Sequence, residues 1–260
     1  STLGNILEDT GNLKDAELYT RKAITLNPSN AEAHYNLAHI LLKAKKFQEG
    51  WKEYAWRWKI KHKSVNLGTN LTTTKPEWSP ENRGRVLLWP EQGLGDELMF
   101  LSLIPDFISY VDELIIQTDK RLIPLLKRTF NQENIHYRSK KEIIEESTYD
   151  FHIAMGSLPK FLRSSLETFQ VSKPFKLQVN QERSNELRSQ LLHHKFKKIV
   201  GVSWKSQSIG LKNKSLSHEQ FILGIYSPNI QFVCLQYGEV KQEIEDIKRK
   251  HGIEILEVSE

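Results

Sequence analysis

The chain has 260 residues, enough for two domains, and its 38% hydrophobic and 27% charged residues are ordinary for a globular protein. The net charge of +5 comes from basic residues spread along the chain, which indicates a solvated surface rather than a nucleic-acid-binding face. The single cysteine, Cys234, excludes an internal disulfide and a cysteine-based zinc site, and its apolar neighbours predict that it is buried and inert. No apolar stretch approaches the roughly 20 residues of a membrane span.

Residues 1–61 repeat with a period of 34, so that Leu3 recurs as Leu37. Small residues recur where two helices would cross, as at Ala16 and Gly50. This period, with a proline at the turn, resembles the tetratricopeptide repeat. Because two repeats cannot bury a solenoid face alone, further repeats are expected upstream.

The turn between the two repeats is Asn27-Pro-Ser-Asn30, and Ser29 with Glu32 is predicted to form a capping box for the next helix. The last repeat helix is rich in aromatic residues. Trp51, Tyr54 and Trp58 have the spacing of one helical face, while Trp56 points elsewhere. This pattern favours an aromatic cap that seals the repeats against the next domain, and a ligand-stacking cluster is the alternative.

Residues 62–84 are polar and aperiodic and are interpreted as a linker, with Trp78 expected to fix it to a neighbouring domain. From residue 85 onward, strands and helices alternate, which predicts parallel sheets covered by helices. The first such unit covers 85–175 and the second, incomplete unit covers 176–260. Strands are predicted at 85–89, 113–117, 134–138, 150–154, 198–204, 230–236 and 253–256, and helices at 96–109, 120–130, 157–164, 180–194, 218–226 and 239–250. Ser217 and Gln220 form a second predicted capping box.

The loop after the first predicted strand carries Gly93, Leu94 and Gly95, followed by Asp96 in the first turn of a helix. Glycines there suit a sharp turn or a close approach of the backbone to a ligand. The loop is not a P-loop, and Leu98 stands where the dinucleotide fingerprint needs a small residue. Asp96 is expected either to cap the helix or to act as a base on a bound substrate.

The loop after residue 204 combines lysines with hydroxyl side chains, a composition that suits a diphosphate, although an exposed polar loop is the alternative. Its candidate ligands are Lys205, Ser206, Lys214 and Ser215, with Lys212 also present. Ser157 and Gln236 follow other strands and could contact an acceptor and a nucleotide, or cap a helix and turn the chain. The histidines show no metal-ligand spacing, so no metal is expected.

A series of short motifs carries a further resemblance. In chain order they are Trp56-Arg-Trp58, Pro76-Glu-Trp78, Trp89-Pro-Glu-Gln-Gly-Leu-Gly-Asp96, Asp150-Phe-His152, Ser157-Leu-Pro159, Gly201-Val-Ser-Trp-Lys205, Lys214-Ser215 and Leu235-Gln-Tyr-Gly238. Over essentially its whole length, the chain resembles bacterial proteins that join tetratricopeptide repeats to a glycosyltransferase-like domain. That domain is similar to the family 9 heptosyltransferases, which have the GT-B fold of two facing Rossmann-like domains.

The resemblance implies metal-independent, inverting sugar transfer from a nucleotide-diphosphate sugar, with no cofactor. In the family, the Asp of the Gly-Asp loop is the proposed base on the acceptor hydroxyl, which corresponds to Asp96. Basic residues after the first strand of the second domain contact the donor diphosphate, which corresponds to Lys205 or Lys214. The chain departs from the family because it stops before the nucleotide-binding half of the second domain, so we expect a fragment cut at both ends that is inactive alone.

Two functions remain open. The first is a cytoplasmic glycosyltransferase whose repeats select a protein or glycan acceptor. The second is a protein-interaction module whose α/β part is non-catalytic. The two hypotheses differ at Asp96, because an enzyme needs this carboxylate to face the substrate rather than only to cap its own helix.

Overall fold

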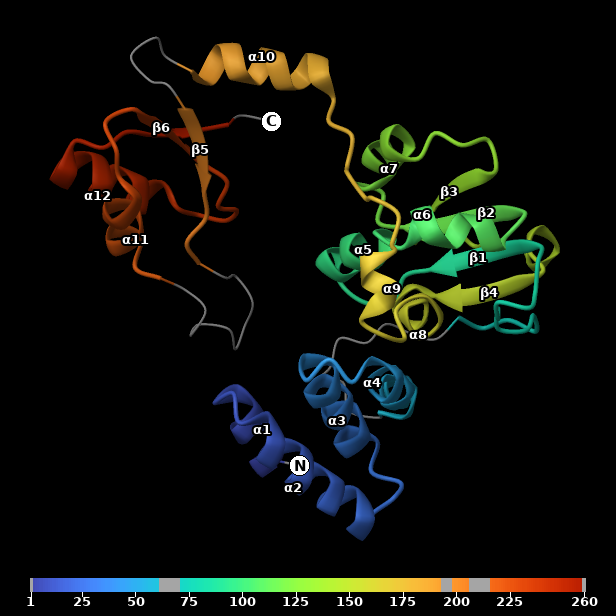
Figure 1. Ribbon diagram of the computed structural model, residues 1–260. Coiled ribbons are helices and arrows are strands. Elements are labelled where there is room, and N and C mark those ends of the chain that lie inside the picture. Colours follow the sequence, from blue (N-terminus) through green and yellow to red (C-terminus); the bar gives the residue numbers. More distant parts are fainter. Residues whose placement is uncertain (1, 61–70, 193–197, 206–215, 259–260) are drawn as a thin grey trace. The chain divides into compact units, whose positions relative to one another are not determined.

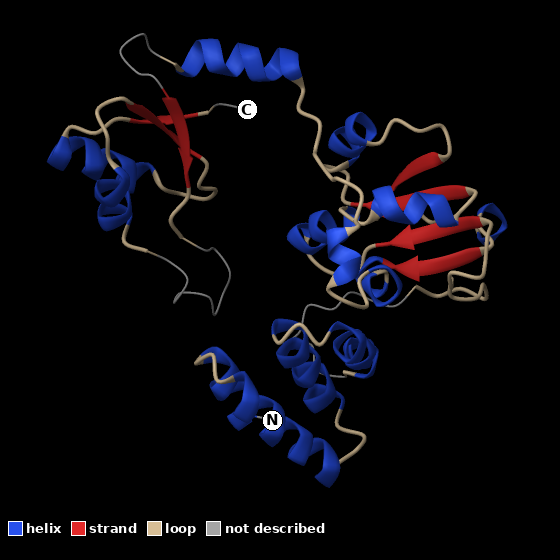
Figure 2. Ribbon diagram, in the orientation of Figure 1, coloured by secondary structure: helices blue, strands red, loops and turns tan. Residues whose placement is uncertain are grey.

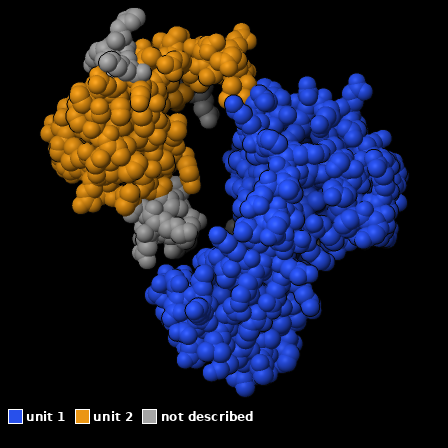
Figure 3. All heavy atoms as spheres, in the orientation of Figure 1, with its two compact units in different colours: residues 1–178 blue, residues 179–260 orange. Residues whose placement is uncertain are grey.

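The computed structural model describes residues 2–60, 71–192, 198–205 and 216–258. The chain divides into two compact units, Ser1–Gln178 and Val179–Glu260 (Figure 3). The first unit holds the tetratricopeptide repeats and a four-stranded sheet, and the second holds a three-stranded sheet; Figure 2 shows the strands of both in red. The predicted order, a helical repeat region followed by parallel α/β structure, is confirmed.

The repeat region is helical throughout its described part (Figure 1). Small residues allow the helices to cross closely, as predicted: Ala16 is fully buried, and a Cβ at Gly50 would lie 2.8 Å from the Leu42 side chain. The elements are α1 (Thr2–Asp9), α2 (Leu13–Leu26), α3 (Ala31–Lys43), α4 (Phe47–Tyr54) and the 3-10 helix η1 (Ala55–Lys59).

The predicted capping box of Ser29 and Glu32 is wrong. Asn30 precedes α3, and its side-chain oxygen accepts the backbone N–H of Ala33 at 3.1 Å. Ser29 instead donates its hydroxyl to the Asn27 side chain. Asparagine is as good a cap as serine, and here it stands one residue closer to the helix.

The first α/β region has four parallel strands in the order β3-β2-β1-β4, so that β1 and β2 are central. Val86 of β1 is in register with Leu114 of β2 and with Phe151 of β4. The strands are β1 (Arg85–Trp89), β2 (Glu113–Thr118), β3 (Ile135–Ser139) and β4 (Phe151–Ala154).

The predicted helix at 96–109 is broken into shorter pieces. Pro105 lies in the first turn of its second piece and has no N–H to donate to the turn before it, so the first piece ends at Leu101. The elements that connect the strands are α5 (Leu94–Leu101), α6 (Ile104–Phe107), η2 (Ile108–Tyr110), α7 (Ile123–Thr129), η3 (Glu146–Thr148), η4 (Met155–Ser157), α8 (Pro159–Leu162) and α9 (Glu167–Gln170).

The two faces of this sheet are covered differently. On one face, Val86 and Leu88 pack against apolar side chains of α5, α6 and α7. On the other face, Leu87 and Trp89 pack against Trp58 of the repeat region and against loop residues. Trp78 is 1% exposed in the helix-covered core, so its predicted role in fixing the segment before β1 is confirmed.

The second unit has three parallel strands in the order β5-β6-β7, with a core between the sheet and its helices. Ser217 is the N-cap residue of α11 but makes no side-chain capping hydrogen bond, so the predicted capping box is only half correct. Cys234 is half-buried rather than buried, and burial raises the pKa of its thiol. The elements are α10 (Gln181–Leu191), β5 (Lys198–Val202), α11 (His218–Ile225), β6 (Ile230–Cys234), α12 (Lys241–His251) and β7 (Ile255–Glu257).

Candidate functional site

In the first unit, the carboxyl ends of β1 and β4 mark the place where open parallel sheets bind their ligands. The chain leaves β1 toward β2 and β3 on one side and returns to β4 on the other, so the loops after β1 and β4 diverge here. Trp89 and Ala154 end the two strands and are partners in register. The residues that follow them are therefore the first to consider as a site.

A side chain of the repeat region occupies this place. Arg57 of η1 forms a bidentate ion pair with Glu91, in which Nη2 lies 3.0 Å from Oε1 and Nε lies 3.2 Å from Oε2. Both side chains are only 1% exposed. Arg57 Nη2 also donates to Ser157 Oγ at 2.8 Å. The guanidinium thus joins the loop after β1, the turn after β4 and the repeats in one buried contact.

The packing around Glu91 leaves little freedom for its carboxylate. Burial raises the pKa of Glu91, and the Arg57 guanidinium beside it acts in the opposite direction. The backbone N–H of Gly156 donates to this carboxylate, and a Cβ at Gly156 would lie 2.0 Å from Glu91 Oε1. Glycine is required at 156 because Glu91 fills the space of a side chain.

The aromatic residues of the last repeat contact the α/β region, as the cap interpretation predicted. Trp51 Nε1 donates to the Arg163 carbonyl at 2.8 Å, the Tyr54 hydroxyl accepts a hydrogen bond from Gln92, and the Trp58 ring lies 5.5 Å from that of Trp89. They do not share one α-helical face, because α4 ends at Tyr54 and Trp58 lies in the 3-10 helix η1. Trp56 points elsewhere and stacks on His34 with ring centroids 3.7 Å apart.

In the segment from Trp89 to Asp96, the exposed part is the start of α5. Gly93 is the N-cap residue, and Asp96, in the first turn, accepts the Gly93 backbone N–H at Oδ2, 3.1 Å away. Asp96 therefore caps its own helix, which was one of its two predicted roles. The contact uses one of the several lone pairs of a half-exposed carboxylate, so the oxygens keep further accepting capacity.

The fold does not require glycine at either position of this loop. Gly93 has an extended backbone with φ −76°, and Gly95 lies within α5. A Cβ at Gly93 would be in ordinary contact with Asp96 at 3.4 Å, and a Cβ at Gly95 would have no neighbour within 4 Å. A sharp turn, one of the two predicted reasons for these glycines, therefore does not require glycine at either position, and close approach of a ligand stays a prediction.

Glu97, the residue after Asp96, was not predicted as a site residue. It is 1% exposed, and its Oε2 accepts the Thr118 hydroxyl at 2.6 Å and the Asp119 backbone N–H at 2.8 Å. Its Oε1 lies 3.5 Å from Lys140 Nζ and accepts no hydrogen bond within the described chain. Glu97 fixes α5 to the carboxyl end of β2, and the signal in the sequence was a second acidic residue beside Asp96 in a helix that is otherwise glycine and apolar residues.

In the second unit, Gln236 organises the carboxyl end of β5. Its side-chain oxygen accepts the Ser203 hydroxyl and the backbone N–H groups of Trp204 and Lys205, each at 3.0 Å. These bonds replace ladder pairing, so β5 ends at Val202 rather than at the predicted 204. Gln236 is 7% exposed and therefore acts within the fold at this point.

Lys205 does not present a free ammonium group, because it pairs with Glu243 of α12. Glu243 Oε2 also accepts the Trp204 indole N–H at 2.6 Å. Burial favours a higher pKa for Glu243, but the hydrogen bonds from Lys205 and Trp204 outweigh it and hold the pKa below its usual value. The other predicted diphosphate ligands, Ser206, Lys214 and Ser215, lie outside the described residues.

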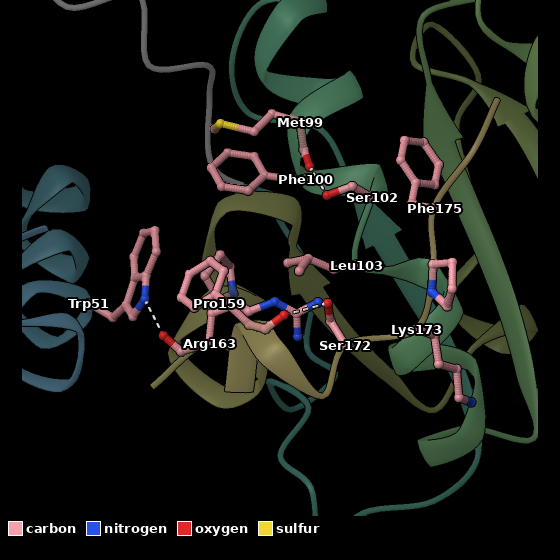
Figure 4. Close-up of a pocket in the computed structure, with 12 residues that line it drawn as sticks. Trp51, Met99, Phe100, Ser102, Leu103, Pro159, Arg163, Ser172, Lys173 and Phe175 are labelled. Atoms are coloured by element: carbon pink, nitrogen blue, oxygen red, sulfur yellow. Dashed lines mark hydrogen bonds between the residues drawn. The ribbon is translucent and has the colours of Figure 1, made fainter. Parts of the chain in front are cut away.

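A pocket of about 340 Å³ opens beside α5, between that helix, α4 and the segment that follows α8 (Figure 4). Trp51, Met99 and Phe169 are among the apolar side chains that line it.

Within the described chain, no group of three or more histidine, cysteine, aspartate or glutamate residues is placed to hold a metal ion. No helix in that part of the chain combines the length and apolar character that crossing a bilayer would take.

The comparison with known proteins supports the repeat assignment. Residues 2–30 and residues 19–52 each match the tetratricopeptide repeat family. Over 237 residues, the chain is 29% identical to Protein FlbA of Caulobacter vibrioides (strain ATCC 19089 / CIP 103742 / CB 15). The similarity includes 84% of this chain and 39% of FlbA, so the chain spans well under half the length of that relative.

Proposed function

We propose that this protein is a glycosyltransferase that moves a sugar from a nucleotide-diphosphate donor to the hydroxyl of a protein or glycan acceptor selected by its repeats. The proposal rests on the start of α5 at the carboxyl end of β1, where a half-exposed Asp96 follows two glycines that the fold does not require. The resemblance of the same residues to the heptosyltransferase motif supports it.

In the proposed reaction, an oxygen of Asp96 accepts the proton of the acceptor hydroxyl. The deprotonated oxygen forms a bond to the anomeric carbon, while the bond from that carbon to the diphosphate breaks and the nucleoside diphosphate departs with both electrons. Glycines at 93 and 95 allow the acceptor to approach the backbone N–H groups at the start of the helix. Lys205, Ser206, Lys214, Ser215 and Gln236 remain the proposed contacts to the donor, with the lysines offsetting the charge of the departing diphosphate; Lys205 would have to exchange Glu243 for it, and Gln236 would have to give up its hydrogen bonds within the second unit.

The contact between the repeats and the α/β region gives the repeats a part in this proposal. Arg57 contacts Glu91 in the loop after β1, and Asp96 lies five residues later in the first turn of α5, which follows that loop. An acceptor held by the repeats would therefore be held on the same compact unit as the proposed base.

The test compares the full-length protein with its Asp96→Asn variant for hydrolysis and transfer with a panel of nucleotide sugars. Asparagine can still accept the Gly93 N–H through its side-chain oxygen, so α5 keeps its cap while the base is lost. A matched control is Asp112→Asn, which removes the same charge from an exposed ion pair with Arg83 just before β2, away from the carboxyl end of the sheet. We expect transfer to fall by about 100-fold or more in Asp96→Asn and to be unchanged in the control. Equal activity in both variants would refute Asp96 as the base.

A second candidate function is a non-catalytic protein-interaction module. Two contacts favour it: Asp96 already caps Gly93, and Lys205 already pairs with Glu243. Absence of both binding and turnover for every donor, with the repeats still binding a protein partner, would favour this second function.

A further inference from the structure

The pocket beside α5 is mostly apolar: eight of its twelve lining residues have apolar side chains. Its walls include Phe100 of α5 and Leu103 just after that helix, Trp51 of repeat helix α4, and Phe169 and Phe175 from the chain that follows α8. At about 340 Å³ it lies at the lower end of the range of small-ligand pockets. The pocket therefore has room for one large side chain with part of its backbone, and its lining favours an apolar group over a polar one.

Apart from Lys173, the polar side chains that line the pocket direct their hydrogen bonds to the protein. The Trp51 indole N–H binds the Arg163 carbonyl, the Ser102 hydroxyl binds the Met99 carbonyl, and the Ser172 hydroxyl binds the Phe169 carbonyl. The Arg163 guanidinium pairs with Asp106 at 2.6 Å. Burying the hydroxyls of a sugar against such walls would cost free energy, because these donors are already in use.

The pocket continues the face of α5 that carries Asp96. Met99, three residues after Asp96, lies on the same side of the helix and is 56% exposed at the pocket. The rise of an α-helix separates the two residues by about 4.5 Å along the axis. That distance is between one and two residues of an extended polypeptide, at about 3.3 Å per residue, and the nearest side chain on the same face is two residues away.

We propose that this pocket binds a large apolar side chain, aromatic or branched aliphatic, of a polypeptide partner. Where that partner is the acceptor, and here the inference rests on the proposed function, the apolar residue lies about two positions from the modified hydroxyl. The pocket is then a specificity site, because it adds affinity for hydroxyls that stand near such a residue.

Two observations favour a polypeptide over a lipid. The wall contributed by Trp51 comes from a tetratricopeptide repeat, a type of module that suggests protein interaction. The Arg163 guanidinium beside the pocket is not available for an anionic headgroup, since it is paired with Asp106 (Figure 4 shows Arg163 at the pocket).

The test measures binding of blocked tripeptides to the full-length protein by saturation-transfer NMR and calorimetry, without any donor. The probes are N-acetyl-Ser-Gly-Trp-amide, its reverse N-acetyl-Trp-Gly-Ser-amide, and N-acetyl-Ser-Gly-Gly-amide as the apolar-free control. We expect saturable binding of at least one tryptophan peptide, with transfer concentrated on the indole, and no binding of the glycine control. No saturable binding of either tryptophan peptide would overturn the proposal.

Variants then place the peptide in the pocket. Met99→Glu puts a charge at an exposed position and keeps a good helix former, and Ser102→Phe fills the pocket; each should weaken binding about tenfold or more. The matched control is Ile143→Glu, an apolar-to-acidic change at a residue that is 92% exposed and absent from the pocket lining, and it should leave binding unchanged. Equal binding by all three variants would overturn the proposal.

Other occupants predict different results. Decanoate binding that Met99→Glu abolishes, with no peptide binding, would assign the pocket to an acyl chain, and a dimer in sedimentation that Met99→Glu dissociates would assign it to a second copy. Either result would overturn the proposal. Peptide binding without sugar transfer in the wild-type protein would refute the glycosyltransferase and retain the pocket.

Discussion

Removing one partner of the Arg57–Glu91 pair should strongly destabilise the first unit. Both side chains are 1% exposed and are joined by a bidentate contact, so either single change leaves a buried group without its partner. Loss of one member of a buried ion pair costs about 3–5 kcal/mol. We expect Arg57→Met and Glu91→Gln each to lower the free energy of unfolding within this range, with Glu91→Gln at the low end because an amide oxygen can still accept from Arg57.

The double variant Arg57→Met/Glu91→Leu carries the decisive comparison. If the two side chains stabilise the unit through their contact, the double variant loses less stability than the single variants Arg57→Met and Glu91→Leu lose in sum. The reason is that in the double variant neither charge remains buried without a partner. The assay is urea unfolding of the whole chain followed by tryptophan emission. Five of the six tryptophans lie in the first unit, Trp204 being the exception, so the signal reports mainly on that unit.

Two results would refute this reasoning. One is a single variant that unfolds at the wild-type urea concentration, which would mean that the pair is solvated. The other is a double variant whose loss equals the sum of the losses of Arg57→Met and Glu91→Leu, which would mean that each side chain stabilises the unit independently.

Two further predictions concern the same unit. Arg85 holds the pKa of Asp150 at about 2, below its usual value of 3.8, so the pair stabilises the fold above pH 3.8 and this stability is lost as the pH falls through about 2. Since Asp150 is 41% exposed, Asp150→Asn should cost at most about 1 kcal/mol near pH 7, and urea unfolding should show the gap narrowing toward pH 2; a gap that stays constant would contradict the pairing. Gly156→Ala should cost about 1–3 kcal/mol because its Cβ would displace Glu91, whereas Gly95→Ala should leave stability equal or slightly higher in the same assay. Loss of sugar transfer in a stable Gly95→Ala variant would indicate that a ligand approaches this backbone.

The sequence was sufficient for the architecture. A 34-residue period and the alternation of strands with helices depend on local pattern, and they placed the seven strands of the described chain within a few residues, whereas the short elements η3 and α9 were not predicted. Errors arose where a single side chain competes with a pattern. Pro105 broke a helix that apolar periodicity had extended, and Gln236 ended β5 by taking the N–H groups of residues 204 and 205.

The site was less predictable because its contacts join distant parts of the chain. Arg57 and Glu91 both stood in recognised motifs, but 34 residues separate them and nothing local pairs them. Lys205 was predicted as a phosphate ligand from its loop, and its partner Glu243 is 38 residues away in α12. Hydrogen-bond partners at such separations follow from the tertiary fold rather than from residue type.

The guanidinium of Arg57 has a consequence for anyone who would divide this protein. The sequence suggests a cut in the polar segment at 62–84, which would release the α/β part as a smaller product. Such a cut would remove the cation that neutralises Glu91 and would expose Trp89 and Gln92, which contact Trp58 and Tyr54. The last repeat is thus part of the packing of the α/β region. A chimera that takes its repeats from a relative would have to keep Arg57, Tyr54 and Trp58 together with the α/β part.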